Sequence, residues 1–153
     1  MAKPETLPLQ ITHEVRDVCL CLHLQRAARV LARRYDDALR PLGLTNGQFS
    51  LLMAINRESV PTMGEVAALL GVDRTTLTAA LKALERRRLV RSLQDRDDRR
   101  SRRLLLTAGG HALMVRALPL WREAQSQAER AMGDRSTSAR LRDDLLRLGR
   151  PKT

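Results

Sequence analysis

Residues 63–107 read MGEVAALLGVDRTTLTAALKALERRRLVRSLQDRDDRRSRRLLLT, and this stretch decides the fold. It predicts two short helices whose apolar side chains recur at three- and four-residue spacing. Gly71 lies between them, at a position that suits a left-handed turn. The pattern Thr62-x-x-Glu65 caps the first helix, and Asp73 caps the second. A helix-turn-helix unit is therefore predicted here.

Two short strands are predicted after the second helix, over residues 89–94 and 102–107, on either side of the charged tip DRDDRRS. Nine arginines and three aspartates lie between residues 86 and 103, so this stretch carries +6 of the chain's net charge of +11. Arginine suits phosphate groups and narrow minor grooves. A helix fits the major groove of DNA, while a basic hairpin reaches the neighbouring minor groove. The expected contacts to double-stranded DNA are Arg74, Thr75, Thr76, Thr78, Lys82, Arg86, Arg96, Arg99 and Arg100.

Simpler explanations of this pattern stay open. A helical hairpin with a glycine turn occurs in many helical domains, and a run of charges is most often a solvated loop. A non-specific DNA-binding protein would carry the same positive charge. Preference for one near-palindromic site, with half-sites about one helical turn apart, distinguishes a sequence-specific regulator from that alternative.

The rest of the chain suits one domain with helical arms. A length of 153 residues and a hydrophobic fraction of 43% allow a compact, aliphatic core. No apolar run approaches the roughly 20 residues of a membrane span, and the N-terminus lacks the apolar centre of a signal peptide. We therefore expect a cytoplasmic protein without membrane contact. Further helices are predicted over residues 13–39, 45–55, 108–133 and 139–149.

An enzyme is not expected. The three histidines, His13, His23 and His111, are scattered along the sequence. The sequence contains no Gly-rich phosphate loop, nucleophile motif or cluster of metal ligands. No metal or cofactor is therefore predicted, and nucleic acid is the leading partner for a chain of this charge.

Residues 42–110 open with LGLTNGQFSLL, continue through the predicted helices and hairpin, and resemble the MarR family of winged helix-turn-helix regulators. The resemblance implies a mainly α (α+β) fold with a two-stranded wing and with N- and C-terminal dimerisation helices. It assigns residues 42–107 to DNA binding, and residues 12–41 and 108–150 to dimerisation. The implied function is a homodimeric transcription regulator, expected to be a repressor, on a near-palindromic operator. Apolar residues near the chain end that fit dimerisation are Leu113, Leu118, Leu141, Leu145 and Leu146.

The family's wing signature, approximately Asp-x-Arg-Asp-x-Arg, falls on residues 95–100. Both acids and the final arginine match, at Asp95, Asp98 and Arg100. Asp97 stands where the family usually has an arginine for the minor groove, so Arg96 or Arg99 is expected to take its place. The resemblance also implies that Asp98 braces an arginine of the wing rather than contacting DNA.

Many similar proteins release DNA when a small aromatic or anionic compound enters the cleft between the dimerisation and DNA-binding regions. The resemblance therefore implies an effector pocket in this chain. Each residue implied for that pocket is of a type that more often lies in an ordinary core or surface. These residues are Cys19, His23, Arg26, Met53 and Trp121.

A thiol-based, peroxide-sensing repressor is the alternative, because some relatives carry a reactive cysteine near the start of the first helix. Cys19 or Cys21 would take that role here. In a continuous helix roughly 200° of rotation separates their side chains, so these two cannot easily form a disulfide with each other. A reactive thiolate also needs a nearby cation or a helix N-terminus, and without one both cysteines are small apolar residues.

Overall fold

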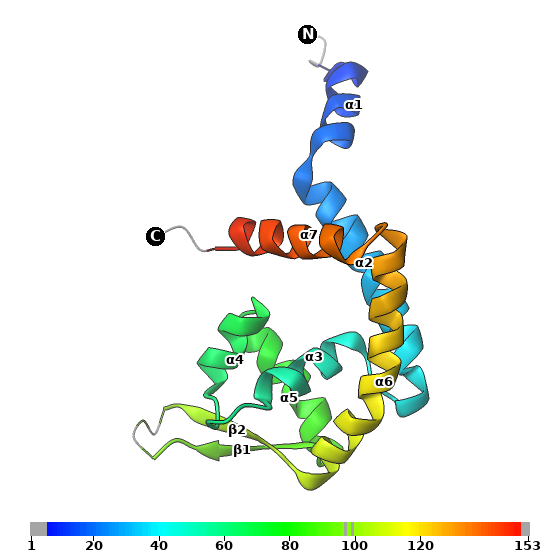
Figure 1. Ribbon diagram of the computed structural model, residues 1–153. Coiled ribbons are helices and arrows are strands. Elements are labelled where there is room, and N and C mark those ends of the chain that lie inside the picture. The colour runs from blue at the N-terminus through cyan, green and yellow to red at the C-terminus, as the bar shows by residue number, and fades with distance from the viewer. Residues whose placement is uncertain (1–5, 97, 99, 151–153) are drawn as a thin grey trace.

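The computed structural model describes residues 6–96, 98 and 100–150 as a winged helix-turn-helix body from which helical arms extend (Figure 1). In this part of the chain the fold is mainly helical, with one two-stranded antiparallel sheet. The predicted fold class is confirmed. The elements are α1 (Leu9–Val18), α2 (Leu20–Leu39), the short 3-10 helix η1 (Arg40–Leu42), α3 (Asn46–Ile55), α4 (Met63–Leu70), α5 (Arg74–Arg86), β1 (Val90–Gln94), β2 (Arg102–Leu106), α6 (Ala108–Ala131) and α7 (Arg135–Leu148).

The helix-turn-helix forms as its capping pattern predicts. The Thr62 hydroxyl accepts from the Glu65 amide at 3.2 Å, and the Glu65 carboxylate accepts from the Thr62 amide at 2.7 Å. Gly71 follows α4 with a φ of 65°, in the left-handed region. Asp73 then caps α5 by accepting from the Thr76 amide at 2.7 Å. Local side-chain contacts therefore position both helices of the turn.

The core lies where α3, α4, α5 and the sheet meet the end of α2 and the start of α6. Burial of aliphatic side chains supplies most of the driving force for such a fold, because each large side chain contributes about 1.5–3 kcal/mol. The Phe49 ring is buried in this core, and the partly buried Trp121 packs against it. The largest fully buried side chains are Leu39, Leu51, Leu52, Val66, Leu77, Leu84 and Leu104.

The two strands of the wing pair antiparallel, with Val90 opposite Leu106. The second strand also bonds to the segment before α4, because the Leu104 amide donates to the Pro61 carbonyl at 2.9 Å. Both predicted strands are confirmed to within one residue at their ends. The wing is thus joined by its main chain to the helix-turn-helix.

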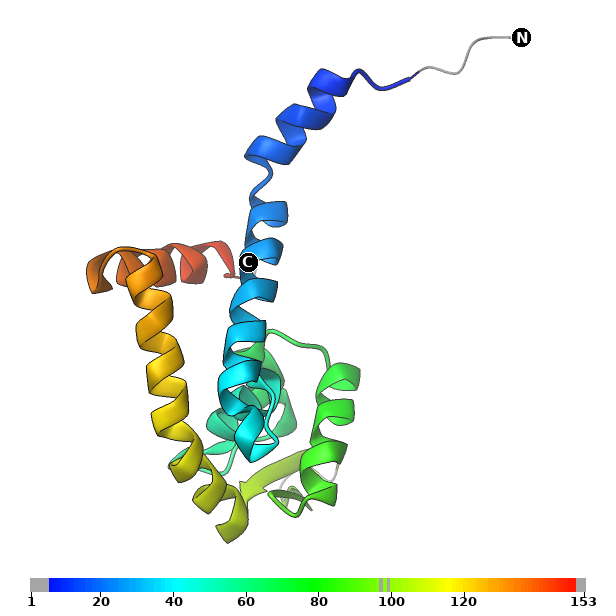
Figure 2. The same ribbon diagram turned by 90° about the vertical axis from the view of Figure 1, so that its right-hand side faces the viewer.

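The helix predicted over residues 13–39 is wrong as a single element, because the chain divides at Cys19 into α1 and α2 (Figure 2). Cys19 is extended, with φ −69° and ψ 105°. Apolar residues stand at alternate positions around it, at Val18, Leu20 and Leu22, and a continuous helix would spread them around its circumference. Val18 and Leu20 are 67% and 69% exposed on either side of the break, and α1 projects away from the other elements with no buried residue.

The helix α6 packs beside α2 and runs unbroken through Pro119. The next helix, α7, turns back from the end of α6 and lies above the winged body in the view of Figure 1. It begins at Arg135 rather than at the predicted residue 139, because Asp134 caps it by accepting from the Thr137 amide at 2.7 Å. Among the described helices, none is both long and apolar enough to cross a membrane.

Candidate functional site

The outer face of α5 is exposed and carries small polar and basic side chains. Every DNA contact predicted on this helix is exposed: Arg74, Thr75, Thr76, Thr78, Lys82 and Arg86. A hollow of about 480 Å³ follows this face, lined by Ala79 and by all of these residues except Thr76. The opposite face is buried through Leu77, Leu81 and Leu84. The core therefore fixes which side of α5 reaches solvent.

Hydrogen bonding at the start of α5 sets its local charge. The Thr76 amide, which donates to Asp73, holds the pKa of that carboxyl below its ordinary value. An ionised carboxylate complements the positive end of the helix dipole. One turn further on, the Thr78 hydroxyl donates to the Arg74 carbonyl at 2.8 Å, so its oxygen can still accept a hydrogen bond. This face therefore carries both hydroxyl groups, which can accept a hydrogen bond, and cationic donors, and both kinds of group can contact base edges.

Arg87 ties the end of α5 to the connection between α2 and α3. Its guanidinium donates to the Gly43 carbonyl at 2.7 Å and to the Leu42 carbonyl at 3.3 Å. Gly43 has a φ of 62°, which favours glycine. Arg87 therefore serves the fold, although it belongs to the arginine-rich stretch that the sequence associates with DNA.

An ion pair lies where the two strands of the wing meet its tip. Asp95 is buried, and its Oδ2 lies 2.6 Å from Nε of Arg103. Arg103 also donates to the Val60 carbonyl at 2.7 Å, and the Ser92 hydroxyl donates to Glu85 of α5 at 2.7 Å. These contacts join both strands to the helix-turn-helix. Sequence reasoning missed the role of Arg103, for which the only signal is its place in the second predicted strand.

The tip of the wing carries the remaining predicted contacts. Arg96 and Arg100 are exposed. Asp98 accepts a hydrogen bond from the Arg100 amide at 2.9 Å and so shapes the turn through the main chain. Its role as a brace for an arginine side chain stays a prediction. Asp97 and Arg99 lie outside the described residues.

The five residues implied for the effector pocket do not line one cavity. Met53 lines an apolar cavity of about 350 Å³ between α3, α4 and α6, to which Trp121 also contributes. His23 and Arg26 line a different hollow, of about 500 Å³, between α2, α6 and α7. Cys19 borders neither of these two cavities. The tertiary packing therefore separates residues that the family resemblance groups together.

Cys19 occupies the N-cap position of α2, where the backbone leaves helical geometry between α1 and α2. Nδ1 of His23 lies 2.9 Å from the Cys19 carbonyl oxygen. Cys21 lies inside the first turn of α2, where its sulfur accepts from Nε2 of Gln25 at 3.2 Å. Both cysteines are unbridged. The two thiols therefore have different surroundings although they are two residues apart.

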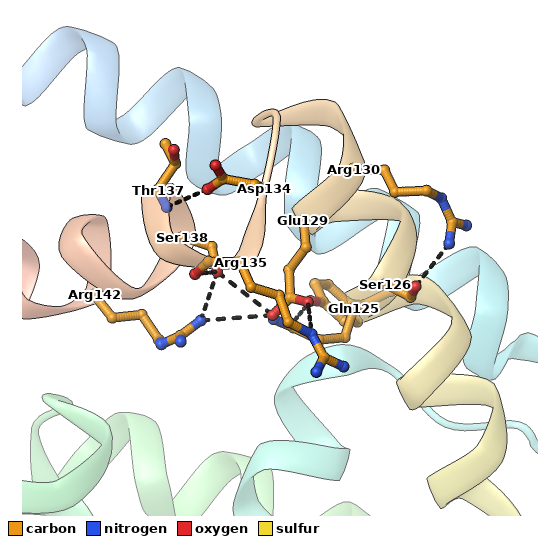
Figure 3. A network of polar contacts seen from close by, with 10 residues as sticks. Gln125, Ser126, Glu129, Arg130, Asp134, Arg135, Thr137, Ser138 and Arg142 are labelled. Atoms are coloured by element: carbon orange, nitrogen blue, oxygen red, sulfur yellow. Dashed lines mark hydrogen bonds and ion pairs between the residues drawn. The ribbon is translucent and has the colours of Figure 1, made fainter.

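A polar cluster joins the end of α6 to α7 (Figure 3). The Glu129 carboxylate accepts from Nε2 of Gln125 at 3.0 Å and from the Ser138 hydroxyl at 3.5 Å. Guanidinium nitrogens of Arg135 and Arg142 lie 3.6 and 3.7 Å from its oxygens. The hydrogen bond from Gln125, assisted by both arginine charges, holds the pKa of Glu129 below its ordinary value. This corner therefore keeps an ionised carboxylate among cations.

Known proteins resemble this chain in the helix-turn-helix and in the helices on either side of it. The model of the MarR family matches residues 42–101. The M. tuberculosis transcriptional regulator MosR, solved in complex with DNA, is 46% identical with a TM-score of 0.77, over 86% of this chain and 93% of that one. The transcriptional repressor CouR, solved with p-coumaroyl-CoA bound, is 27% identical with a TM-score of 0.76, over 91% and 96% of the two chains.

Curated relatives align over a smaller part of their length. The organic hydroperoxide resistance transcriptional regulator of Bacillus subtilis (strain 168) is 28% identical over 101 residues, which are 66% of this chain and 69% of that protein. The chain spans 50% to 62% of the length of three other curated transcriptional regulators that it matches. The likeness to solved structures, in contrast, runs through nearly the whole chain.

Proposed function

Because the chain belongs to the MarR family of winged helix-turn-helix transcriptional regulators, we propose that it binds a near-palindromic DNA operator as a homodimer. Members of this family regulate transcription and are not enzymes. In the proposed complex each protomer places α5 in a major groove and its wing in the adjacent minor groove, and the bound protein represses transcription. Residues 42–107 bind DNA in this proposal, whereas residues 12–41 and 108–150 dimerise. The exposed face of α5, with its threonines and basic side chains, is the observation that carries the proposal.

Apolar residues on the arms support the homodimer. Leu9 and Val18 of α1 are 74% and 67% exposed, and Leu146 of α7 is 68% exposed. A soluble protein seldom leaves such a series of large apolar side chains in water, so a second copy is the natural cover for them. Two copies would present two α5 helices to one duplex, which matches a two-fold symmetric operator.

Replacing Thr76 with alanine should relax base preference at one or two positions of each half-site, by about 1 kcal/mol per position. The reason is that a base contact carries sequence information, whereas a phosphate contact does not. Arg100→Ala is the matched contrast, because it should weaken binding to all sequences. It should also lower the magnitude of the slope of log affinity against log salt concentration by about one, because one phosphate contact is lost. Binding-site selection followed by anisotropy titrations at several salt concentrations measures both. If wild-type protein selects no site, it is a non-specific binder and the proposal fails.

A small aromatic or anionic effector that releases the operator is the second part of the proposal. The apolar cavity beside Met53 and Trp121 supports it, because a volume of about 350 Å³ between α3, α4 and α6 suits a small ligand. The relative CouR, with p-coumaroyl-CoA bound, supports a ligand with an aromatic group. A ligand there contacts both the DNA-binding region and the dimerisation region, so it can favour one relative placement of the two.

Peroxide sensing by a thiol is a second candidate function, and the position of Cys19 favours it. The N-terminus of a 20-residue helix favours negative charge, and Cys19 is the cap of α2. In this reaction the Cys19 thiolate attacks the O–O bond and takes one oxygen to become a sulfenic acid. The other oxygen takes up a proton and leaves as an alcohol or water. The similar organic hydroperoxide resistance regulator supports this chemistry.

Treatment with cumene hydroperoxide should lower operator affinity at least tenfold in this second proposal, and dithiothreitol should restore it. Cys19→Ser should remove the response, because the reacting sulfur is gone. Cys21→Ser is the control that keeps Cys19 and should still respond. Anisotropy of a labelled operator measures the affinity, and an unchanged response in Cys19→Ser would rule out Cys19 as the sensor.

A further inference from the structure

Arg87 connects the end of α5 to the end of the long arm helix α2. It is the C-cap residue of α5, and its backbone amide donates to the Ala83 carbonyl. Its side chain contacts residues that lie 44 and 45 positions earlier in the sequence, at Gly43 and Leu42. Gly43 is the C-cap of η1, which continues directly from α2. One guanidinium therefore joins two elements that the sequence keeps far apart.

This contact is made at two points by one planar group. Nη1 of Arg87 donates to the Gly43 carbonyl and Nη2 to the Leu42 carbonyl, whereas the main-chain bonds that end η1 use earlier carbonyls. The N–H groups of a guanidinium point in fixed directions, so paired bonds to successive carbonyls set an orientation as well as a distance. Arg87 therefore fixes the angle at which α5 meets the end of α2.

The other contacts of α5 do not set this angle in the same way. In the described part of the chain, the other side-chain hydrogen bonds of residues 74–87 stay within α5 or go to β1 of the wing. Leu84 of α5 and Leu39 of α2 share the core, but apolar burial is not directional. The directional contact between α5 and the arm is thus the fork of Arg87.

The angle between α2 and α5 matters because the proposed dimer reads two half-sites at once. The arm α2 lies in the region proposed to dimerise, whereas α5 lies in the region proposed to bind DNA. Their angle therefore sets the separation and the rotation between the two α5 helices of a dimer. Each added base pair moves a half-site by roughly 3.4 Å and turns it by roughly 35° around the duplex. A dimer with α5 held at one angle accordingly fits one spacing.

We infer that Arg87 determines which spacing between half-sites the dimer accepts, by holding α5 at one angle to α2. Arg87 is in this role a positioning residue that acts through α5 and contacts no base. The inference rests on the proposed binding of a near-palindromic operator by a homodimer. Side chains such as Thr76 select the bases within a half-site, whereas Arg87 selects the arrangement of the two half-sites.

Operators of altered spacing test this role on the full-length protein. Selection with wild-type protein supplies the operator, and duplexes with one base pair added or removed between the half-sites supply the comparison. Anisotropy titrations should show wild-type protein preferring the selected spacing by about tenfold or more, because the added rotation misplaces the second α5. Arg87→Gln should reduce this preference to about threefold or less and leave base preference within each half-site unchanged.

Two further variants separate positioning from charge. Arg88→Gln removes the same charge at the next residue, which is exposed and whose side chain has no hydrogen bond or ion pair with the described residues. It should keep the spacing preference. Arg87→Lys keeps the charge but not the planar fork, so it should keep the salt dependence and lose most of the preference. A direct phosphate contact of Arg87 would give the opposite pattern, with weaker binding at every spacing and an unchanged preference.

Spin labels on the two α5 helices measure the geometry without DNA. The chain has two cysteines, so Cys19→Ser and Cys21→Ser leave Ala80→Cys as the only site for a label. Ala80 is exposed on α5 and is not among the expected DNA contacts. The distances between the two labels of a dimer should spread about twice as widely in Arg87→Gln as in its parent. Circular dichroism should show the same helix content in both.

The outcomes distinguish this inference from the proposed function. Wild-type protein that binds its selected operator equally well at all spacings would overturn the inference and leave the regulator standing. An Arg87→Gln variant with the wild-type spacing preference would do the same. If wild-type protein selects no operator, the proposed function fails, and unchanged label distances in Arg87→Gln would then refute the positioning role as well.

Discussion

Gly110→Ala is expected to destabilise the protein by about 3 kcal/mol or more. Gly110 is buried in the first turn of α6, and an added Cβ would lie 2.2 Å from the Leu89 carbonyl oxygen. That oxygen cannot easily move away, because it accepts hydrogen bonds from the Thr107 amide at 3.0 Å and the Thr107 hydroxyl at 3.2 Å. The close approach of α6 to the start of the wing therefore requires glycine.

Thermal and urea unfolding followed by circular dichroism measure this effect. For a chain of this size 3 kcal/mol corresponds to a fall in Tm of roughly 6–12 °C. Gly47→Ala is the matched control, because Gly47 is helical and an added Cβ there meets no atom within 4 Å. It should leave stability unchanged or raise it by up to about 1 kcal/mol. Equal stability of Gly110→Ala and wild type would contradict the close packing of α6 against Leu89.

Changing both Leu145 and Leu146 to aspartate is expected to separate the proposed dimer and to lower operator affinity by a factor of about 100 or more. The two leucines are 39% and 68% exposed on α7. Burying two unpaired carboxylates in an apolar interface costs several kcal/mol, and about 2.7 kcal/mol already corresponds to a factor of 100. A monomer also loses the effective concentration that joins two half-sites.

Sedimentation velocity measures the state of assembly, and anisotropy measures operator binding. Leu69→Asp is a suitable control, because Leu69 is 59% exposed on α4, within residues 42–107 that the proposal assigns to DNA binding rather than to dimerisation. It should remain dimeric. A dimeric, operator-binding Leu145→Asp, Leu146→Asp variant would show that α7 does not hold the two copies together.

The winged body was predictable because its boundaries depend on neighbouring residues. Thr62 and Glu65 cap each other, and Gly71 adopts the left-handed turn that its position indicates. The arms were less predictable. No glycine or proline marks the break at Cys19 in the sequence. The early start of α7 follows from Asp134, a cap that competes with the serines and threonine after it. Where several residues could each cap the start of a helix, the packing of the whole fold decides which one does so.

The candidate site was predictable on α5 and less so on the wing and in the cavities. Periodicity alone separates the outer face of α5 from its buried face. The arginines between residues 86 and 103 look alike in sequence, yet Arg87, Arg102 and Arg103 are held by carbonyl, hydroxyl or carboxylate groups of the protein. Those partners are distant in sequence or lie across the sheet. Which residues line a cavity depends in the same way on how α3, α4 and α6 meet.

The contacts of Arg103 and Ser92 that hold the wing against the rest of the helix-turn-helix have a mechanical consequence. Arg103 joins β2 both to Asp95 and to the Val60 carbonyl, while Ser92 joins β1 to Glu85 of α5. The wing and α5 are therefore joined into one rigid unit. A conformational change that reaches this unit moves the hairpin and α5 together, so the contacts to DNA proposed for each of them are gained or lost together.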